Sequence, residues 1–133
     1  MSSAPPPPAG QGPHILVIED EPAVQTLLKK QLAAHGFRVT VAGDGLDGLM
    51  KLETLKPDLM ICDVMMPNLD GMGFVKAIKA HKGTEKIPVI FLTAKTDPRS
   101  MIEGINVGAR FYVTKPFQID DLLSKVRRAL SGK

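Results

Sequence analysis

Five short apolar segments alternate with five segments of helical periodicity, and this alternation constrains the fold more than any other feature of the sequence. The short segments are rich in β-branched residues and are typical of strands: His14–Ile18, Arg38–Ala42, Leu59–Asp63, Pro88–Thr93 and Phe111–Thr114. The segments that follow them carry apolar residues at helical spacing: Pro22–Ala34, Asp44–Leu55, Met72–Ala80, Arg99–Val107 and Ile119–Leu130. Strands joined by helical crossovers form parallel sheets that are covered on both faces. The predicted fold class is therefore α/β, a doubly wound, five-stranded parallel sheet.

The first 13 residues differ in composition from the rest of the chain. The segment MSSAPPPPAGQGP holds five of the 11 prolines and no charged side chain, so it cannot build a packed core. It predicts a disordered or polyproline-like tail over residues 1–13, either a solvated spacer or a ligand for an aromatic groove of a partner. The predicted organisation is this tail followed by one domain over residues 14–133.

Composition and charge exclude several classes of protein. The formal net charge of +3 is too small to indicate nucleic-acid binding. No apolar run approaches the roughly 18–20 residues of a membrane span, and the N-terminus has no signal-peptide pattern, so we expect a cytoplasmic protein without membrane insertion. A single cysteine, Cys62, excludes an internal disulfide framework and a multi-cysteine zinc site.

Polar residues follow the predicted strands at the edge where ligands bind to open α/β sheets. These residues are Glu19, Asp20 and Glu21 after the first strand, Asp63 after the third, Thr93 after the fourth and Lys115 after the fifth. Asp20 and Asp63 end neighbouring strands and would repel each other strongly, so the site requires a cation. Oxygen ligands without histidine or thiol neighbours favour Mg²⁺.

The same residues predict a phosphoryl acceptor. We expect neither a GxxxxGK[ST] nor a GxGxxG phosphate loop, so a bound nucleotide is not predicted. A carboxylate beside a metal can form an aspartyl phosphate, and Lys115 and Mg²⁺ would neutralise the transferring oxygens. The Thr93 hydroxyl would donate a hydrogen bond to one of them.

Four segments together carry a resemblance to a known family. They are ILVIEDEP at 15–22, LMICDVMMPNLDG at 59–71, VIFLTAK at 89–95 and YVTKPF at 112–117. With these motifs the chain resembles, over residues 14–130, the receiver domain of two-component response regulators, in particular the single-domain, chemotaxis-regulator-like members. The resemblance implies a flavodoxin-like (βα)5 fold with strand order 2-1-3-4-5. Glu19-Asp20 departs from the common Asp-Asp pair of the family.

The resemblance also implies a role for each site residue. Asp63 would be the phosphoacceptor, and Asp20 would ligate Mg²⁺ directly. Glu19 would act on the metal through water, and the backbone carbonyl of Met65 would complete the protein's share of the metal ligands. Thr93 and Tyr112 would form the switch pair, Lys115 would contact the phosphoryl group, and the Lys115–Pro116 bond would be cis.

The function implied is a phosphorylation-dependent switch rather than an enzyme acting on a free metabolite. A sensor histidine kinase or phosphotransfer protein would donate the phosphoryl group, and a downstream protein would bind the face made by helix four, strand five and helix five. We expect no direct nucleic-acid contact, and a monomer or a weak phosphorylation-dependent dimer. Either a stand-alone receiver or a fragment of a longer regulator fits the sequence.

A chain of this kind has three alternative functions. A flavin mononucleotide-binding protein would need a phosphate loop where Glu19, Asp20 and Glu21 stand. A Mg²⁺ nuclease or topoisomerase-type fold would need a second aspartate where Met65 stands. A pseudo-receiver, which binds partners without phosphorylation, remains as the alternative function.

Overall fold

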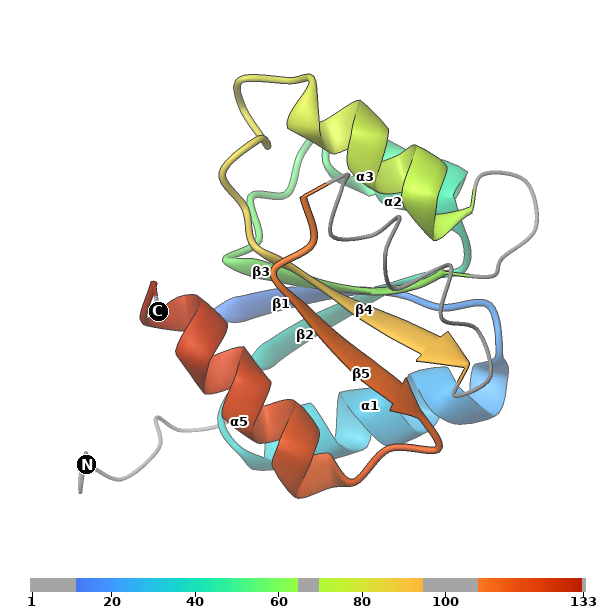
Figure 1. Ribbon diagram of the computed structural model, residues 1–133, viewed down its shortest axis with the longest axis vertical. Coiled ribbons are helices and arrows are strands. Elements are labelled where there is room, and N and C mark those ends of the chain that lie inside the picture. Colours follow the sequence, from blue (N-terminus) through green and yellow to red (C-terminus); the bar gives the residue numbers. More distant parts are fainter. Residues whose placement is uncertain (1–11, 65–69, 95–107, 133) are drawn as a thin grey trace.

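The computed structural model describes residues 12–64, 70–94 and 108–132, which form a parallel sheet with helices on both faces (Figure 1). The strands are β1 (His14–Ile18), β2 (Arg38–Ala42), β3 (Leu59–Asp63), β4 (Val89–Ala94) and β5 (Phe111–Lys115). The helices are α1 (Pro22–Ala34), α2 (Gly45–Lys51), α3 (Gly71–Lys79) and α5 (Ile119–Leu130). The predicted helix Arg99–Val107 and most of the predicted tail lie outside the described residues.

The strands lie in the order β2-β1-β3-β4-β5, and all four neighbouring pairs are parallel, which confirms the predicted topology. The chain passes from β1 outward to β2 and then returns to the other side of β1 to form β3. Strand order therefore reverses at β1 and β3, and the carboxyl ends of these two strands lie at the topological switch point of the sheet.

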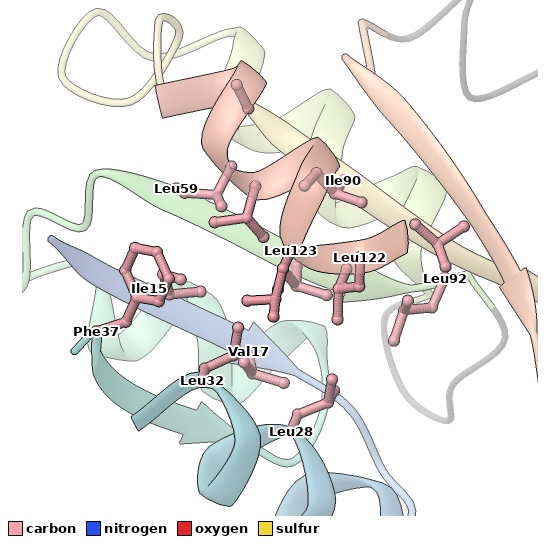
Figure 2. Close-up of a cluster of buried hydrophobic side chains, with 14 residues drawn as sticks. Ile15, Val17, Leu28, Leu32, Phe37, Leu59, Ile90, Leu92, Leu122 and Leu123 are labelled. Atoms are coloured by element: carbon pink, nitrogen blue, oxygen red, sulfur yellow. The ribbon is translucent and has the colours of Figure 1, made fainter. Parts of the chain in front are cut away.

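Two hydrophobic cores cover the two faces of the sheet. Because successive side chains of a strand point to opposite faces, Ile15 and Val17 join one core while Leu16 and Ile18 join the other. Figure 2 shows the first core, where leucines of α1 and α5 meet the side chains of β1, β3 and β4. The second core packs α2 and α3 against the opposite face, around the fully buried Phe74.

Local signals explain where the helices begin and end. Pro22 occupies the first turn of α1, where a missing N–H costs nothing, and Gly36 ends that helix with a φ of 92°. The side chain of Asp70 caps α3 by accepting a hydrogen bond from the N–H of Gly73 at 2.8 Å. Asp120 lies in the first turn of α5, where a negative charge favours the helix dipole.

Helix α2 is the main correction to the predicted elements. The prediction of Asp44–Leu55 was too long at both ends, because Asp44 is the cap and the helix ends at Lys51. After Lys51 the chain continues in turns, with the N–H of Glu53 bonded to the carbonyl of Met50. The apolar spacing continues through these turns, since Leu52 still packs against the core. Strands β4 and β5 and helix α3 differ from the prediction by one residue at their ends.

The described chain begins at Gly12, whose N–H donates to the carbonyl of Gly36 at 3.0 Å. None of the helices in the described ranges is long and apolar enough to cross a bilayer.

Candidate functional site

Parallel pairing brings the ends of four strands to one edge of the sheet. Ile18 pairs with Cys62, so Glu19 and Asp63, the next residue of each strand, are neighbours across β1 and β3. On the other side, Asp63 pairs with Leu92, and Thr93 pairs with Thr114. The predicted site residues from four strands therefore meet beyond the switch point.

Three carboxylates form a cluster at this edge. One oxygen from each of Glu19, Asp20 and Asp63 lies within 4.8 Å of the others. Glu19 is fully buried and Asp63 is 5% exposed, whereas Asp20 is open to solvent. The cluster thus combines a deep, dry side with an open side through which an ion can enter.

Burial makes the charge of Glu19 costly. It raises the pKa of the Glu19 carboxyl to about 7, and the negative charge of Asp63 adds to the rise. The N–H of Glu21, which donates to Glu19 Oε2 at 3.1 Å, and the Lys115 ammonium oppose it. Glu19 Oε1 is buried, and the Lys115 ammonium, 3.0 Å away, is shared with Asp63. A buried carboxylate that shares one ammonium with a second carboxylate fits a hard divalent cation such as Mg²⁺.

Lys115 supplies the positive charge of the site. Its Nζ lies 3.0 Å from Asp63 Oδ2, 3.0 Å from Glu19 Oε1 and 3.4 Å from Glu21 Oε1. Burial alone would lower the pKa of Lys115, but hydrogen bonds and charge from Asp63 and Glu19 outweigh burial and raise it above its ordinary value. The bond between Lys115 and Pro116 is cis, as the resemblance implied.

Neighbouring groups fix the backbone of the cluster. The Gln25 side chain of α1 donates from Nε2 to the Glu19 carbonyl oxygen at 2.5 Å. A Cβ on Gly71 would lie 2.5 Å from the carbonyl oxygen of Asp63 and 2.9 Å from Cα of Val64, so only glycine lets α3 begin this close to β3. Helices α1 and α3 are therefore joined directly to the backbone of the acidic residues.

The predicted switch residues lie on the two neighbouring strands. Thr93 is 1% exposed at the end of β4. Tyr112 is half-buried on β5, and its ring centroid is 5.9 Å from that of Phe91 at an interplanar angle of 45°. Phe91 and Thr93 are two residues apart on β4, so both face the α2–α3 side of the sheet, as Tyr112 does. Thr93 and Tyr112 therefore lie on the same face of the sheet, with Thr93 at the acidic edge and Tyr112 further from it.

Most predicted site residues are thus brought together, and the exceptions have specific reasons. Met65 lies outside the described residues, so the predicted carbonyl ligand has no described position. Glu21 was named among the polar residues of this edge but was given no role in the site, and Gln25 was not predicted. Glu21 follows Asp20 directly, and taken alone it is explained as a first-turn residue of α1. Gln25 follows one turn later, and helical side chains lean toward the N-terminus of their helix.

The prediction against a nucleotide assumed that no GxGxxG pattern occurs, and the glycine-rich segment between β2 and α2 shows that this premise was wrong. Residues 43–48 read GDGLDG and match the GxGxxG spacing. In the structure Asp47 Oδ2 accepts from the N–H of Gly43 and Asp44 Oδ1 accepts from the N–H of Asp47, so carboxylates already occupy N–H groups of this loop. A Cβ on Gly48 would lie 2.9 Å from Phe74, which gives that glycine a packing role. The segment does not form a phosphate site.

Two cavities of the described structure lie away from the acidic cluster. One, of about 440 Å³, lies between α2 and α3 and is lined mainly by apolar side chains such as Leu52 and Ile78. The other, of about 320 Å³, lies near the C-terminal ends of α3 and α5 and includes Lys79 and Arg110. No residue of the acidic cluster lines either cavity.

Comparison with known proteins gives consistent matches along the chain. The profile of the response regulator receiver domain matches residues 15–127. The alkaline phosphatase synthesis transcriptional regulatory protein PhoP of Bacillus subtilis is 40% identical over 116 residues, which are 87% of this chain and 48% of that protein. The DNA-binding response regulator MtrA of Mycolicibacterium smegmatis is 37% identical over 117 residues, which are 88% of this chain and 50% of that protein. The chain spans about half the length of these relatives.

Solved structures match at the level of the whole fold. A putative response regulator from Chloroflexus aurantiacus superposes with a TM-score of 0.88 at 31% identity and covers 91% of this chain and 99% of its own. The receiver domain of a sensor histidine kinase from Pseudomonas aeruginosa, with a magnesium ion coordinated in its active-site cleft, has a TM-score of 0.84 at 30% identity and covers 90% of this chain and 98% of its own.

Proposed function

The chain belongs to the response regulator receiver domain family, and from that membership we propose that Asp63 accepts a phosphoryl group from a phosphohistidine of a partner protein. Receiver domains of two-component systems are phosphorylation-dependent signalling switches rather than classical enzymes. The observation that carries the proposal is the position of Asp63, a nearly buried carboxylate 3.0 Å from the Lys115 ammonium at the edge of an acidic cluster.

The proposal assigns Mg²⁺ to the acidic cluster. Asp20 and Asp63 would hold it directly, Glu19 through water, and the backbone carbonyl of Met65 would complete the set. The burial of Glu19 and the three carboxylate oxygens within 4.8 Å of one another support this assignment. When bound, the ion would offset the negative charge of the transferring phosphoryl oxygens.

In the proposed transfer, a carboxylate oxygen of Asp63 attacks phosphorus. The new O–P bond forms as the P–N bond to the partner's histidine breaks, and the bonding electron pair stays on that imidazole nitrogen. Lys115 pairs with a phosphoryl oxygen once Asp63 no longer carries a free carboxylate charge. Catalysis by this chain is thus positioning and charge neutralisation.

The output of the switch would start at Thr93. Its hydroxyl donates a hydrogen bond to a phosphoryl oxygen, and the Tyr112 ring turns inward behind it. Because both side chains lie on the α2–α3 side of the sheet, movement of one opens or fills space next to the other. The changed face would include β5 and α5, together with the predicted fourth helix.

The partners in this proposal are a histidine kinase or phosphotransfer protein and a downstream protein, in the cytoplasm. Two relatives are named as a transcriptional regulator and a DNA-binding regulator, but this chain spans about half of their length. We therefore keep direct nucleic-acid contact out of the function proposed for residues 14–133. The domain would act as a monomer or as a weak dimer when phosphorylated.

Intact-mass measurement tests the proposal. We expect incubation with acetyl phosphate and Mg²⁺ to add one phosphoryl group, and expect the gain to vanish in Asp63→Ala and in the presence of a chelator. Circular dichroism of Asp63→Ala checks that the variant is folded. Absence of any gain, in protein shown by titration to bind Mg²⁺, would contradict the proposal and favour a pseudo-receiver that works unphosphorylated.

A further inference from the structure

We propose that Glu21 is a positioning residue that retains the Lys115 ammonium at the rim of the acidic cluster and thereby slows phosphoryl uptake from anionic donors. This inference rests on the proposed function, because it concerns the rate of the same phosphorylation. It assigns a role to a residue that the sequence explains as an ordinary member of a helix N-terminus.

The geometry of Glu21 does not match that ordinary role. Glu21 stands at the N-cap of α1 with extended backbone, and its side chain makes no capping hydrogen bond. The carboxylate, 61% exposed, instead accepts a hydrogen bond from Lys115 Nζ at 3.4 Å, across 94 residues of sequence. Its side chain therefore serves the strand ends rather than the helix.

The contacts of Lys115 show why this interaction gains importance with a metal present. Glu19 and Asp63, the partners at 3.0 Å, belong to the acidic cluster that can hold a cation, whereas Glu21 does not. A divalent cation held by this cluster would compete with Lys115 for the carboxylates of Glu19 and Asp63 and would repel the ammonium. Among the described residues, Glu21 is then the remaining carboxylate partner of Lys115, and it keeps the ammonium at the mouth of the site.

Charge balance gives the sign of the effect on phosphorylation. Four carboxylates, those of Glu19, Asp20, Glu21 and Asp63, face one ammonium, so the ionised site carries −3 and retains −1 after a divalent cation binds. An anionic phosphodonor is repelled by this charge, and the Lys115 ammonium must leave Glu21 to reach a phosphoryl oxygen. Removing the Glu21 charge lowers both barriers.

The test is the second-order rate constant of phosphorylation by acetyl phosphate at saturating Mg²⁺. In this reaction the P–O bond to acetate breaks as the Asp63–phosphorus bond forms, and acetate leaves with the electron pair. We expect Glu21→Gln to raise the rate constant about threefold to tenfold at low ionic strength, and less at high ionic strength. Because Mg²⁺ is saturating, a lower Mg²⁺ affinity of the variant does not change the compared rate constants.

Two further variants separate the effect of the Glu21–Lys115 contact from the electrostatic effect of removing any one negative charge. Glu21→Asp keeps the charge but is one methylene shorter, so it loses the contact with Lys115 and keeps the repulsion of the donor. Retention of Lys115 therefore predicts a rate between those of the wild type and Glu21→Gln. Glu53→Gln makes the same charge change at an exposed position in the turns after α2, and we expect it to behave as the wild type. A Glu21→Gln rate equal to or below that of Glu53→Gln would overturn the inference, as would a Glu21→Asp rate equal to that of the wild type.

A measurement without phosphorylation separates this inference from the proposed function. The side-chain NMR signals of Lys115 in Mg²⁺-saturated protein, assigned with Lys115→Arg, should shift in Glu21→Gln and stay unchanged in Glu53→Gln. Unchanged Lys115 signals in Glu21→Gln would refute the inference even if the wild type is phosphorylated. A wild type that takes up no phosphoryl group would refute the proposed function, and with it the effect on uptake, whatever the NMR signals show.

Discussion

At the scale of single residues, the site depends on a buried charge that is only partly neutralised. Glu19 is fully buried, and a carboxylate in that position loses most of its hydration. Lys115 approaches it at 3.0 Å but is shared with Asp63, so one ammonium serves two deep carboxylates. Burial, together with the charge of Asp63, raises the pKa of Glu19 to about 7 although Lys115 opposes the rise. A second cation at this place relieves the imbalance, which connects the metal proposal to the electrostatics of one residue.

Gly71 gives a residue-scale prediction about packing at the site. In Gly71→Ala the new Cβ would meet backbone atoms of Asp63 and Val64, which cannot move away by changing a rotamer. We expect the free energy of unfolding to fall by about 2 kcal/mol, as measured by urea denaturation.

Gly43→Ala is the matched control, because nothing lies within 4 Å of a Cβ at Gly43. We expect its free energy of unfolding to stay within about 0.5 kcal/mol of the wild type. Equal stabilities of the two variants would show that the close approach of α3 to β3 does not require glycine.

Single residues also show which features of the site the sequence could predict and which it could not. Asp63, Asp20 and Lys115 were placed correctly, because strand ends follow from periodicity and parallel strands end at one edge. The contact between Glu21 and Lys115 spans 94 residues and depends on the reach of two side chains, which periodicity does not describe. The cis bond before Pro116 came from the family resemblance alone.

At the scale of elements, strands and helices were predicted about equally closely, with α2 as the exception. The bounds of β1, β2, β3, α1 and α5 match the prediction. Helix α2 was predicted too long because Leu52 and Leu55 continue its spacing, although the backbone already turns after Lys51. Apolar spacing records which side chains are buried, and turns can bury side chains at the same spacing as a helix.

The cap of α3 gives a prediction at this scale. Asp70 accepts the N–H of Gly73 at 2.8 Å and begins the helix that lies against Asp63. We expect Asp70→Ala to lower the free energy of unfolding by about 1 kcal/mol in urea denaturation, because this N–H loses its partner. Asp70→Asn keeps an acceptor oxygen and should retain most of the stability. An Asn variant as unstable as the Ala variant would show that the charge, and not the capping bond, stabilises α3.

At the scale of the whole molecule, the small net charge of +3 conceals an uneven distribution of acidic and basic residues along the helices. Helices of this fold run antiparallel to the strands, so their N-terminal ends lie at the same edge as the acidic cluster (Figure 1). In α2, α3 and α5, acidic residues lie at the N-terminal end: Asp44, Asp70, Asp120 and Asp121. Basic residues lie in the last turn of the same helices: Lys51, Lys76, Lys79, Arg127 and Arg128. The acidic side chains that interact favourably with the helix dipoles thus add negative charge to the edge that already carries the site.

This polarity predicts that a divalent cation stabilises the entire domain. A ligand that binds only the folded state, at about 100 times its dissociation constant, adds about 2.7 kcal/mol to the free energy of unfolding. For a domain of this size we expect saturating Mg²⁺ to raise the melting temperature by roughly 10 °C, as measured by differential scanning calorimetry. The rise should reverse on chelation, because metal removal restores the repulsion among Glu19, Asp20 and Asp63.

Asp20→Asn is the control for this prediction, since Asp20 is the open member of the cluster and its removal leaves the buried carboxylates in place. We expect this variant to melt at a higher temperature than the metal-free wild type, because one repelling charge is gone, and to gain little from Mg²⁺. A similar gain in both proteins would mean that the ion acts elsewhere on the acidic edge. The repulsion at the strand ends would then be balanced by Lys115 alone, and the cation would not belong to the site that holds Asp63.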